Sequence, residues 1–147
     1  MRVMRVIIAG SRAIKGQLAY DLIEEAVDET GWRITEVVSG DAEGVDQVGV
    51  EWAKKNKLDY VIMPANWKLH GKRAGYLRNQ KMAWYVRSAS RILELQGKEV
   101  PDKWRCGLIA IWNGTSRGTA HMIDLAREMN LEVIVIHPPE GSVSSES

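Results

Sequence analysis

The sequence lacks several features that mark particular protein classes. It has no Phe, only four Pro and a single cysteine, Cys106, so an internal disulfide is excluded and a reducing compartment is favoured. No histidine lies near Cys106 in the sequence, so we expect a core residue rather than a nucleophile. No apolar run reaches the roughly 18 residues of a membrane helix, and the run near the N-terminus is too short for a signal-peptide core. We therefore expect a cytoplasmic protein.

Acidic residues are missing from one long segment. Between Tyr60 and Leu93 there is no Asp or Glu, but there are seven Lys and Arg. Because the whole chain has a net charge of +1, the remainder carries −6. A solvated helix face normally mixes both signs, so this one-sided charge favours an anionic partner. The cations are Lys68, Lys72, Arg73, Arg78, Lys81, Arg87 and Arg91.

Metal-binding patterns are also missing. The histidines His70, His121 and His137 have no suitably spaced Cys or His partner, so we expect no metal site and no cofactor. Six Trp without any Phe is an unusual aromatic content, and Trp is enriched at subunit interfaces. A homodimer fits this composition.

Short apolar runs rich in β-branched residues alternate with amphipathic helical patterns. Each run is continuous and closed by Gly or Pro, as expected for strands buried on both faces of a parallel sheet. The alternation predicts the α/β class, with an open parallel sheet and helices on both faces. The runs are "RVMRVIIAG", "ITEVVSG", "DYVIMP", "GLIAIWNG" and "LEVIVIHP".

The helical patterns and the chain ends predict a simple organisation. The apolar helix faces begin at Leu18, Val45, Met82 and Met122. Gly71 and Gly75 interrupt the basic segment, so we expect no helix there before about Tyr76. Asn130 is the expected left-handed stop of the last helix. At 147 residues the chain fits one domain over 1–139, with a disordered tail over 140–147 and a polar connector from Gln96 to Trp104.

The loop after the first run, "AGSR", has the composition of an anion-binding turn. In parallel sheets such loops gather at the carboxyl edge, where ligands bind. Gly10 permits a tight turn, Ser11 offers a hydroxyl, and Arg12 offers a planar group that suits phosphate or carboxylate. These three residues are candidate ligand contacts.

The loop after the second run, "SGDAEGVD", begins at Ser39 and brings an acidic side chain to a helix start. Gly40 and Gly44 let the backbone bend closely, and Asp46 falls in the first helical turn. Asp46 either complements the helix dipole or accepts a hydrogen bond from a ribose or base. The sequence leaves both interpretations open.

The third loop is the basic segment itself. Arg78 and Asn79 follow Gly75 and are expected near a helix N-terminus, where backbone N–H groups attract anions. Trp67 is a candidate for stacking on a base, although Trp is more often a core or interface residue.

The fourth loop, "WNGTSRGT", combines glycines with hydroxyls directly before a helix. Gly114 and Gly118 flank Thr115 and Ser116, and Thr119 leads into the helix. The hydroxyls either form a phosphate cradle with free N–H groups or simply cap the helix. Four such loops at one edge favour a phosphate-bearing ligand.

Taken in order, the loops resemble a known family. The set G-S-R, S-G-x-x-x-G-V-D, P-x-x-W-x-x-x-G-x-x-A-G-x-x-R-N and W-x-G-x-S-x-G-T resembles the SLOG superfamily of Rossmann-like proteins, over Arg5 to Pro138. It looks closest to the YspA-like, cpYpsA-related branch found in bacteria and phages. The resemblance implies a five-stranded Rossmann-like sheet that binds nucleotides or nucleotide-derived signals. In the usual strand order 3-2-1-4-5, Gly10–Arg12 would face Gly114–Thr119 across the ligand crevice.

Two positions depart from the superfamily. Its phosphoribohydrolases carry a G-G-x-G-T-x-x-E loop whose glutamate takes part in cleavage, and Met122 stands at that position here. A thioether serves as neither acid nor base. The superfamily often has a glycine pair where Asp41 follows Gly40 here, and a carboxylate there repels phosphate unless it turns away or meets a cation.

These features leave three hypotheses for the function. The leading one is binding, for sensing or processing, of a nucleotide-derived phosphate ligand in a cleft at the carboxyl ends of the strands. The second is N-glycosidic hydrolysis of a nucleoside monophosphate, with Asp46 and Arg78 as candidate catalytic residues. The third is single-stranded nucleic-acid binding by the basic segment. The prediction of one ligand pocket requires Arg12, Arg78 and Ser116 to lie near one another rather than on separate surfaces.

Overall fold

The five predicted runs form one parallel sheet. The structure is a computed structural model that describes residues 3–99 and 104–142. Its strands are β1 (Val3–Gly10), β2 (Glu36–Ser39), β3 (Asp59–Ile62), β4 (Trp104–Ile111) and β5 (Glu132–Ile136). They are paired in parallel in the order β3-β2-β1-β4-β5. The predicted α/β class, the open parallel sheet and its 3-2-1-4-5 order are confirmed.

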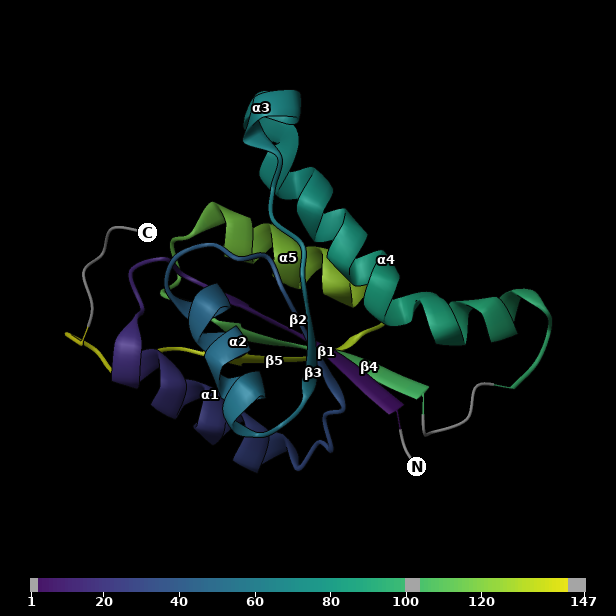
Figure 1. Cartoon of the computed structure of the whole chain (residues 1–147), viewed down its shortest axis with the longest axis horizontal. Helices are drawn as coiled ribbons and strands as arrows, with labels where there is room; N and C mark the ends of the chain where they lie inside the picture. Colours follow the sequence, from purple (N-terminus) through teal and green to yellow (C-terminus); the bar gives the residue numbers. More distant parts are fainter. Residues whose placement is uncertain (1–2, 100–103, 143–147) are drawn as a thin grey trace.

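Helices cover both faces of this sheet. They are α1 (Gly16–Thr30), α2 (Val45–Lys55), α3 (Trp67–His70), the 3-10 turn η1 (Gly71–Arg73), α4 (Ala74–Leu95) and α5 (Arg117–Glu128). The α1 and α2 helices pack on one face, and α4 and α5 pack on the other (Figure 1). The short α3 stands apart from both layers at the start of α4 (Figure 1).

The central strands are apolar over most of their length because both of their faces are covered, and Arg5 and Arg105 near their starts are the exceptions. In β1, Val6 packs toward α1 and α2, while Ile7 packs toward α4 and α5. Leu108 and Ile109 alternate in the same way in β4, and all four side chains are fully buried. A strand between two helical layers needs no polar face, which explains the continuous apolar runs.

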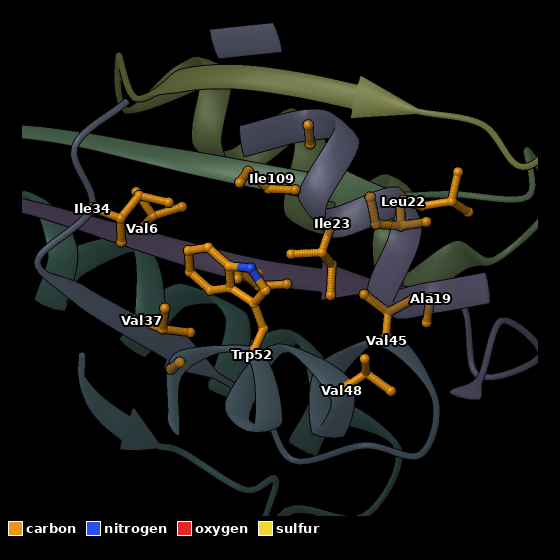
Figure 2. Packing of buried hydrophobic residues seen from close by; sticks show 14 of the residues in the cluster. Val6, Ala19, Leu22, Ile23, Ile34, Val37, Val45, Val48, Trp52 and Ile109 are labelled. Atoms are coloured by element: carbon orange, nitrogen blue, oxygen red, sulfur yellow. The ribbon is translucent and has the colours of Figure 1, made fainter. Parts of the chain in front are cut away.

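Trp52 fills the layer between the sheet and α1. It comes from α2, is buried, and lies among Val6, Val37 and Ile23 (Figure 2). Its ring nitrogen Nε1 has no hydrogen-bond partner among the described residues. The indole therefore contributes apolar packing while leaving one buried donor unsatisfied, which carries a free-energy cost.

Most helix ends follow the sequence signals. Gly31 terminates α1 with a left-handed φ of 65°, and its N–H donates to the Val27 carbonyl at 3.0 Å. Asn130 also takes a left-handed φ of 60°, as predicted, two residues after α5 ends. Cys106 is buried in the core, as expected, and this burial raises the pKa of its thiol.

The prediction that no helix forms before about Tyr76 is wrong. Residues 67–73 are already helical, because Asn66 caps α3 by accepting the Leu69 N–H at 3.0 Å. Gly71 terminates α3 with a left-handed φ of 56°, and η1 begins there. Gly75 does not break anything, and it lies inside α4. Of the two glycines expected to interrupt the helix, only Gly71 does so.

The remaining predictions concern the connector and the tail. The connector is confirmed at its start, since α4 ends at Leu95 and Gly97 takes a left-handed φ of 70°, but residues 100–103 lie outside the described part. Residues 140–142 form a turn in which the Ser142 N–H donates to the Pro139 carbonyl at 3.1 Å. The rest of the predicted tail, 143–147, also lies outside that part. Within residues 3–99 and 104–142, no helix is both long and apolar enough to cross a membrane.

Candidate functional site

The turn after β1 is tied directly to the turn after β4. The Ser11 N–H donates to the Ile111 carbonyl at 3.1 Å, and the Ser11 hydroxyl accepts the Asn113 N–H at 3.1 Å. Gly10 lies so close to Ile111 that an added Cβ would be 2.3 Å from its carbonyl oxygen. The fold therefore brings the first and fourth predicted loops together at the centre of the sheet, where the strand order reverses.

Asp46 lies at the base of this junction. It belongs to the first turn of α2 and is buried. Its carboxyl oxygens accept the Gly10 N–H and the Ala42 N–H, both at 3.3 Å. Burial raises the pKa of Asp46 to about 6, against the lowering effects of Arg78, the two backbone donors and Arg12. A carboxyl group with this pKa changes its charge near neutral pH.

Arg78 reaches the same place from the opposite layer. Its Nη1 donates to the Gly40 carbonyl at 2.5 Å, and its Nε donates to Asn79 Oδ1 at 3.1 Å. A Cβ on Gly40 would be 2.3 Å from Arg78 Nη1 and 2.9 Å from Asp46 Oδ2, so both side chains border this glycine. Burial lowers the pKa of Arg78, while Asp46 raises it and Arg12 lowers it further.

Arg12 is exposed at the rim of this cluster. Its charge acts on both Asp46 and Arg78, which places it in the same neighbourhood. Two guanidinium groups therefore accompany one carboxyl group, so the cluster is net positive even when Asp46 is ionised. This balance favours an anion.

The loop between β4 and α5 is organised by Asn113, which is not among the predicted ligand contacts. Asn113 Oδ1 accepts the N–H groups of Thr115 and Ser116, both at 3.0 Å. The Ser116 hydroxyl lies 3.2 Å from that of Thr119 and does not cap α5. Asn113 Nδ2 is buried without a hydrogen-bond partner among the described residues. The Asn-Gly pair at 113–114 was the available signal, because Asn side chains often organise such turns.

Asn79 connects α4 to the start of α5. Its Nδ2 donates to the Gly118 carbonyl at 3.2 Å and lies 3.0 Å from His121 Nδ1. Because Nδ2 is a donor, this contact requires His121 Nδ1 to be the acceptor. Burial lowers the pKa of His121, which favours that neutral form. His121 has no neighbouring partner in the sequence, because Asn79 is 42 positions away in the chain.

Arg78 and Asn79 do not lie at a helix N-terminus, contrary to the prediction. They are the fifth and sixth residues of α4, which begins at Ala74 and directly follows η1. Their own side chains, rather than free backbone N–H groups, face the cluster.

Several predicted contacts are engaged in holding the loops. Ser11, Ser39 and Thr119 are buried, and the Ser39 hydroxyl donates to the Asp46 carbonyl at 2.8 Å. Gly44 fits closely against the loop after β1, since an added Cβ would be 2.7 Å from the Arg12 carbonyl oxygen. Direct ligand contact by these residues stays a prediction. Gly114 and Thr115 are exposed at the loop surface.

Trp67 lies outside this cluster. It is 52% exposed on α3, and its ring end would be 3.5 Å from a Cβ on Gly75. Trp67 and Gly75 therefore belong to the region around α3 rather than to the junction of the strand ends.

Neither a second hollow nor a metal cluster competes with this site in the described part of the chain. A hollow of about 490 Å³ between the starts of α1 and α2 contains the ion pair of Lys15 and Glu43 at 3.5 Å, but neither Arg12 nor Arg78 lines it. In the described part of the chain, no group of three His, Cys, Asp or Glu residues could hold a metal ion.

Asp41 resolves one departure from the superfamily pattern. It has a left-handed φ of 61°, a conformation that glycine adopts freely and Asp tolerates, and it is exposed. Asp41 thus takes a backbone shape suited to the second glycine of the pair. The other departure is Met122, which stands where the phosphoribohydrolases have a glutamate. Its side chain is buried in the core, so it has a packing role.

Comparisons with known proteins agree with the predicted resemblance. Residues 4–70 match the YspA, cpYpsA-related SLOG family, which confirms the family resemblance over that part. The "Gene 61 protein" of Mycobacterium phage D29 is 29% identical over 136 residues, covering 88% of this chain and 94% of the phage protein. A crystal structure of a predicted subunit of a tRNA methyltransferase from Methanocaldococcus jannaschii aligns with 97% of this chain and 71% of its own, at 14% identity and a TM-score of 0.40. That last likeness is too weak to carry an inference.

Proposed function

We propose that this chain, whose residues 4–70 match the YspA, cpYpsA-related SLOG family, binds a nucleotide or nucleotide-derived phosphate ligand at the carboxyl ends of β1, β2 and β4. The observation that carries the proposal is the position of Arg78. Its guanidinium borders Gly40 and the buried Asp46, beside the reversal of strand order. Ligands of open parallel sheets bind at this reversal.

The donors of Arg78 suit a bidentate anion. A guanidinium has five N–H donors, and the bonds to Gly40 and Asn79 use two of them. We assign the remaining donors, together with the exposed Arg12, to the phosphate group. Planar guanidinium groups match phosphate oxygens in pairs, which a point charge such as Lys does not.

Asp46 fits the role of an acceptor for a ribose hydroxyl or base N–H. An ionised carboxylate offers about four lone-pair positions, and two backbone N–H groups occupy two of them. A ligand with a donor group next to its phosphate would satisfy the rest. This combination favours a nucleotide over inorganic phosphate.

The test is calorimetric titration with adenosine monophosphate, ADP-ribose, a cyclic nucleotide and inorganic phosphate. We expect at least one nucleotide to bind, and Arg78→Ala to weaken it at least tenfold, since hydrogen bonds to charged groups contribute about 1.5–3 kcal/mol. Arg33→Ala, which removes an exposed arginine between α1 and β2, is the matched control and should leave the affinity unchanged. No heat from any nucleotide at millimolar concentration, or equal losses in the two variants, would contradict the proposal.

N-glycosidic hydrolysis is the second candidate, favoured by the pKa of about 6 at Asp46. The glutamate of the phosphoribohydrolase loop is replaced by Met122, so Asp46 would have to supply the carboxyl group. Chromatography of nucleoside monophosphates incubated with the protein should then show free base, and Asp46→Asn should abolish it. Base release that is unchanged in Asp46→Asn would remove Asp46 from this role.

A further inference from the structure

The region around α3 is exposed in a way that the fold does not require. We call residues 67–76, from Trp67 through the first residues of α4, the α3 projection. No side chain of α3 or η1 is buried, and Trp67, Leu69 and Tyr76 are 52%, 71% and 45% exposed. In Figure 1 this part of the chain stands beyond the helical layer that covers the sheet. Core packing therefore does not explain its aromatic side chains.

The charge of the α3 projection is positive and uncompensated. Lys68, Lys72 and Arg73 are exposed, and among the described residues none of them has a carboxylate within 4.0 Å. The chain has no Asp or Glu from Tyr60 to Leu93 that could supply one locally. Some cations elsewhere are paired with a carboxylate, as in the ion pair of Arg87 with Glu94 at 2.7 Å. The missing counter-charge favours a polyanion as the partner.

The indole ring of Trp67 is covered by the protein on one side and exposed on the other. Its ring end packs over Gly75, where the absence of a side chain leaves room for the indole. Tyr76 is similarly held, edge-on to His121 with 4.6 Å between the ring centroids. Rings that are fixed on one side and open on the other lose little entropy when an unpaired base stacks on them.

We propose that the α3 projection binds single-stranded nucleic acid, with its cations along the phosphates and Trp67 stacked on a base. Alternating cations and aromatic rings are the chemistry of sequence-independent strand binding. A duplex is disfavoured because its bases are already stacked on one another. An acidic protein would satisfy the cations but leaves the exposed rings without a role. This proposal is independent of the nucleotide site, which uses Arg12, Arg78 and Asp46.

The test is fluorescence anisotropy of labelled 12-nucleotide oligothymidine and oligouridine at 50 mM and 200 mM NaCl. We expect binding that weakens steeply with salt, and about tenfold weaker binding by Trp67→Ala, since one base loses its stacking surface. Trp67→Tyr should restore most of the affinity. Trp84→Ala is the matched control, because Trp84 is 51% exposed on α4 outside the projection. Its affinity should equal that of the unchanged protein.

Charge variants provide the second arm. Lys72→Ala/Arg73→Ala should lower the slope of log affinity against log salt by about 1.4, the value expected for two phosphate contacts on a single strand. Lys54→Ala/Lys55→Ala removes two exposed lysines from α2 and should leave the slope unchanged. Thermal unfolding by circular dichroism checks that each variant folds.

Three outcomes would overturn the proposal. They are the absence of binding at 50 mM NaCl, equal losses in Trp67→Ala and Trp84→Ala, and displacement of the oligonucleotide by polyglutamate with no effect of Trp67→Ala. The last result would indicate an acidic protein partner instead. Arg78→Ala should retain oligonucleotide binding while losing the nucleotide, so failure of one proposal is distinguishable from failure of the other.

Discussion

At the scale of single residues, Asp46 is the least ordinary group in the molecule. Its burial carries a cost, because taking a carboxylate out of water is unfavourable even beside Arg78 and two backbone donors. The hydrogen bonds from Gly10 and Ala42 and the charge of Arg78 offset part of this cost. The position is explained if the carboxyl group serves a ligand, as we propose.

The first prediction concerns how Asp46 couples stability to pH. Its pKa rises from 3.8 to about 6 on folding, so the folded state binds more protons than the unfolded state between these values. The Asp46 contribution therefore makes the free energy of unfolding fall as pH rises from about 4 to 6, by roughly 3 kcal/mol at most. Urea denaturation of the unchanged protein and Asp46→Asn at pH 4, 5, 6 and 7 measures the difference. A difference that does not vary with pH would contradict the raised pKa.

The second prediction concerns Trp52. Trp52→Phe removes the unpaired Nε1–H while keeping most of the apolar ring. Removing an unsatisfied buried donor should raise the free energy of unfolding by about 1–3 kcal/mol. The smaller ring packs less well and should lower it by a comparable amount. We expect a free energy of unfolding within about 1 kcal/mol of the original, by denaturant titration. Trp52→Ala, which leaves a cavity, should lower the free energy of unfolding by at least about 3 kcal/mol. Similar losses in Trp52→Phe and Trp52→Ala would contradict this prediction.

The hydrogen-bond partners of individual residues could not be predicted from the sequence. Ser11 and Ser39 are predicted ligand contacts. In the fold the Ser11 hydroxyl joins the loops after β1 and β4, and the Ser39 hydroxyl holds the loop between β2 and α2. Asn113 and His121 were not selected, although both belong to the cluster of contacts around α5. Residue type shows that a side chain can form a hydrogen bond, but only the fold determines which partner it meets.

At the scale of elements, the starts of α2, α4 and α5 determine the geometry of the proposed site. Each helix brings one group to the same edge: Asp46 from α2, Arg78 from α4 and the Ser116–Gly118 turn from α5. Asn79 links the last two. Arg78 lies one turn beyond the start of α4, which directly follows α3 and η1.

The third prediction compares Gly118, where a side chain has room, with Gly10, where it does not. Gly118, in the first turn of α5, has nothing within 4 Å of an added Cβ, so Gly118→Ala should raise the free energy of unfolding by up to about 1 kcal/mol. Gly10→Ala should destabilise the protein clearly, because the new Cβ meets the Ile111 carbonyl at 2.3 Å. Thermal and urea denaturation measure both. If Gly118→Ala is stable but loses the nucleotide, the ligand approaches the α5 backbone at this residue; stabilities in the opposite order would show that the loop packing is misassigned.

At the scale of the whole molecule, one sheet separates two apolar layers. Ile109 belongs to the layer beneath α1 and α2, and Leu108 belongs to the layer beneath α4 and α5. They are neighbours in β4, the strand paired with both β1 and β5. Neither layer persists without the strands that it shares with the other.

The fourth prediction follows from these shared strands. Ile109→Ala and Leu108→Ala should each lower the free energy of unfolding by about 2–5 kcal/mol, the usual cost of such a cavity. Both variants should still unfold in one transition, with coincident far-ultraviolet and near-ultraviolet circular dichroism curves in urea. Separate transitions for Leu108→Ala would show that the two layers unfold independently, contrary to this expectation.

The sequence by itself determined the class of the fold, because continuous β-branched runs that alternate with amphipathic helical patterns are typical of a parallel sheet covered by helices on both faces. It also identified Arg12, Asp46 and Arg78 as candidates, since glycines and charged side chains that follow strands are visible in the residue order. Tertiary structure alone decided that Asp46 is buried, that Arg78 crosses to Gly40 and that Asn79 reaches Gly118. These contacts join residues 36 to 39 positions apart, and such proximity depends on how helices pack across a sheet rather than on local sequence.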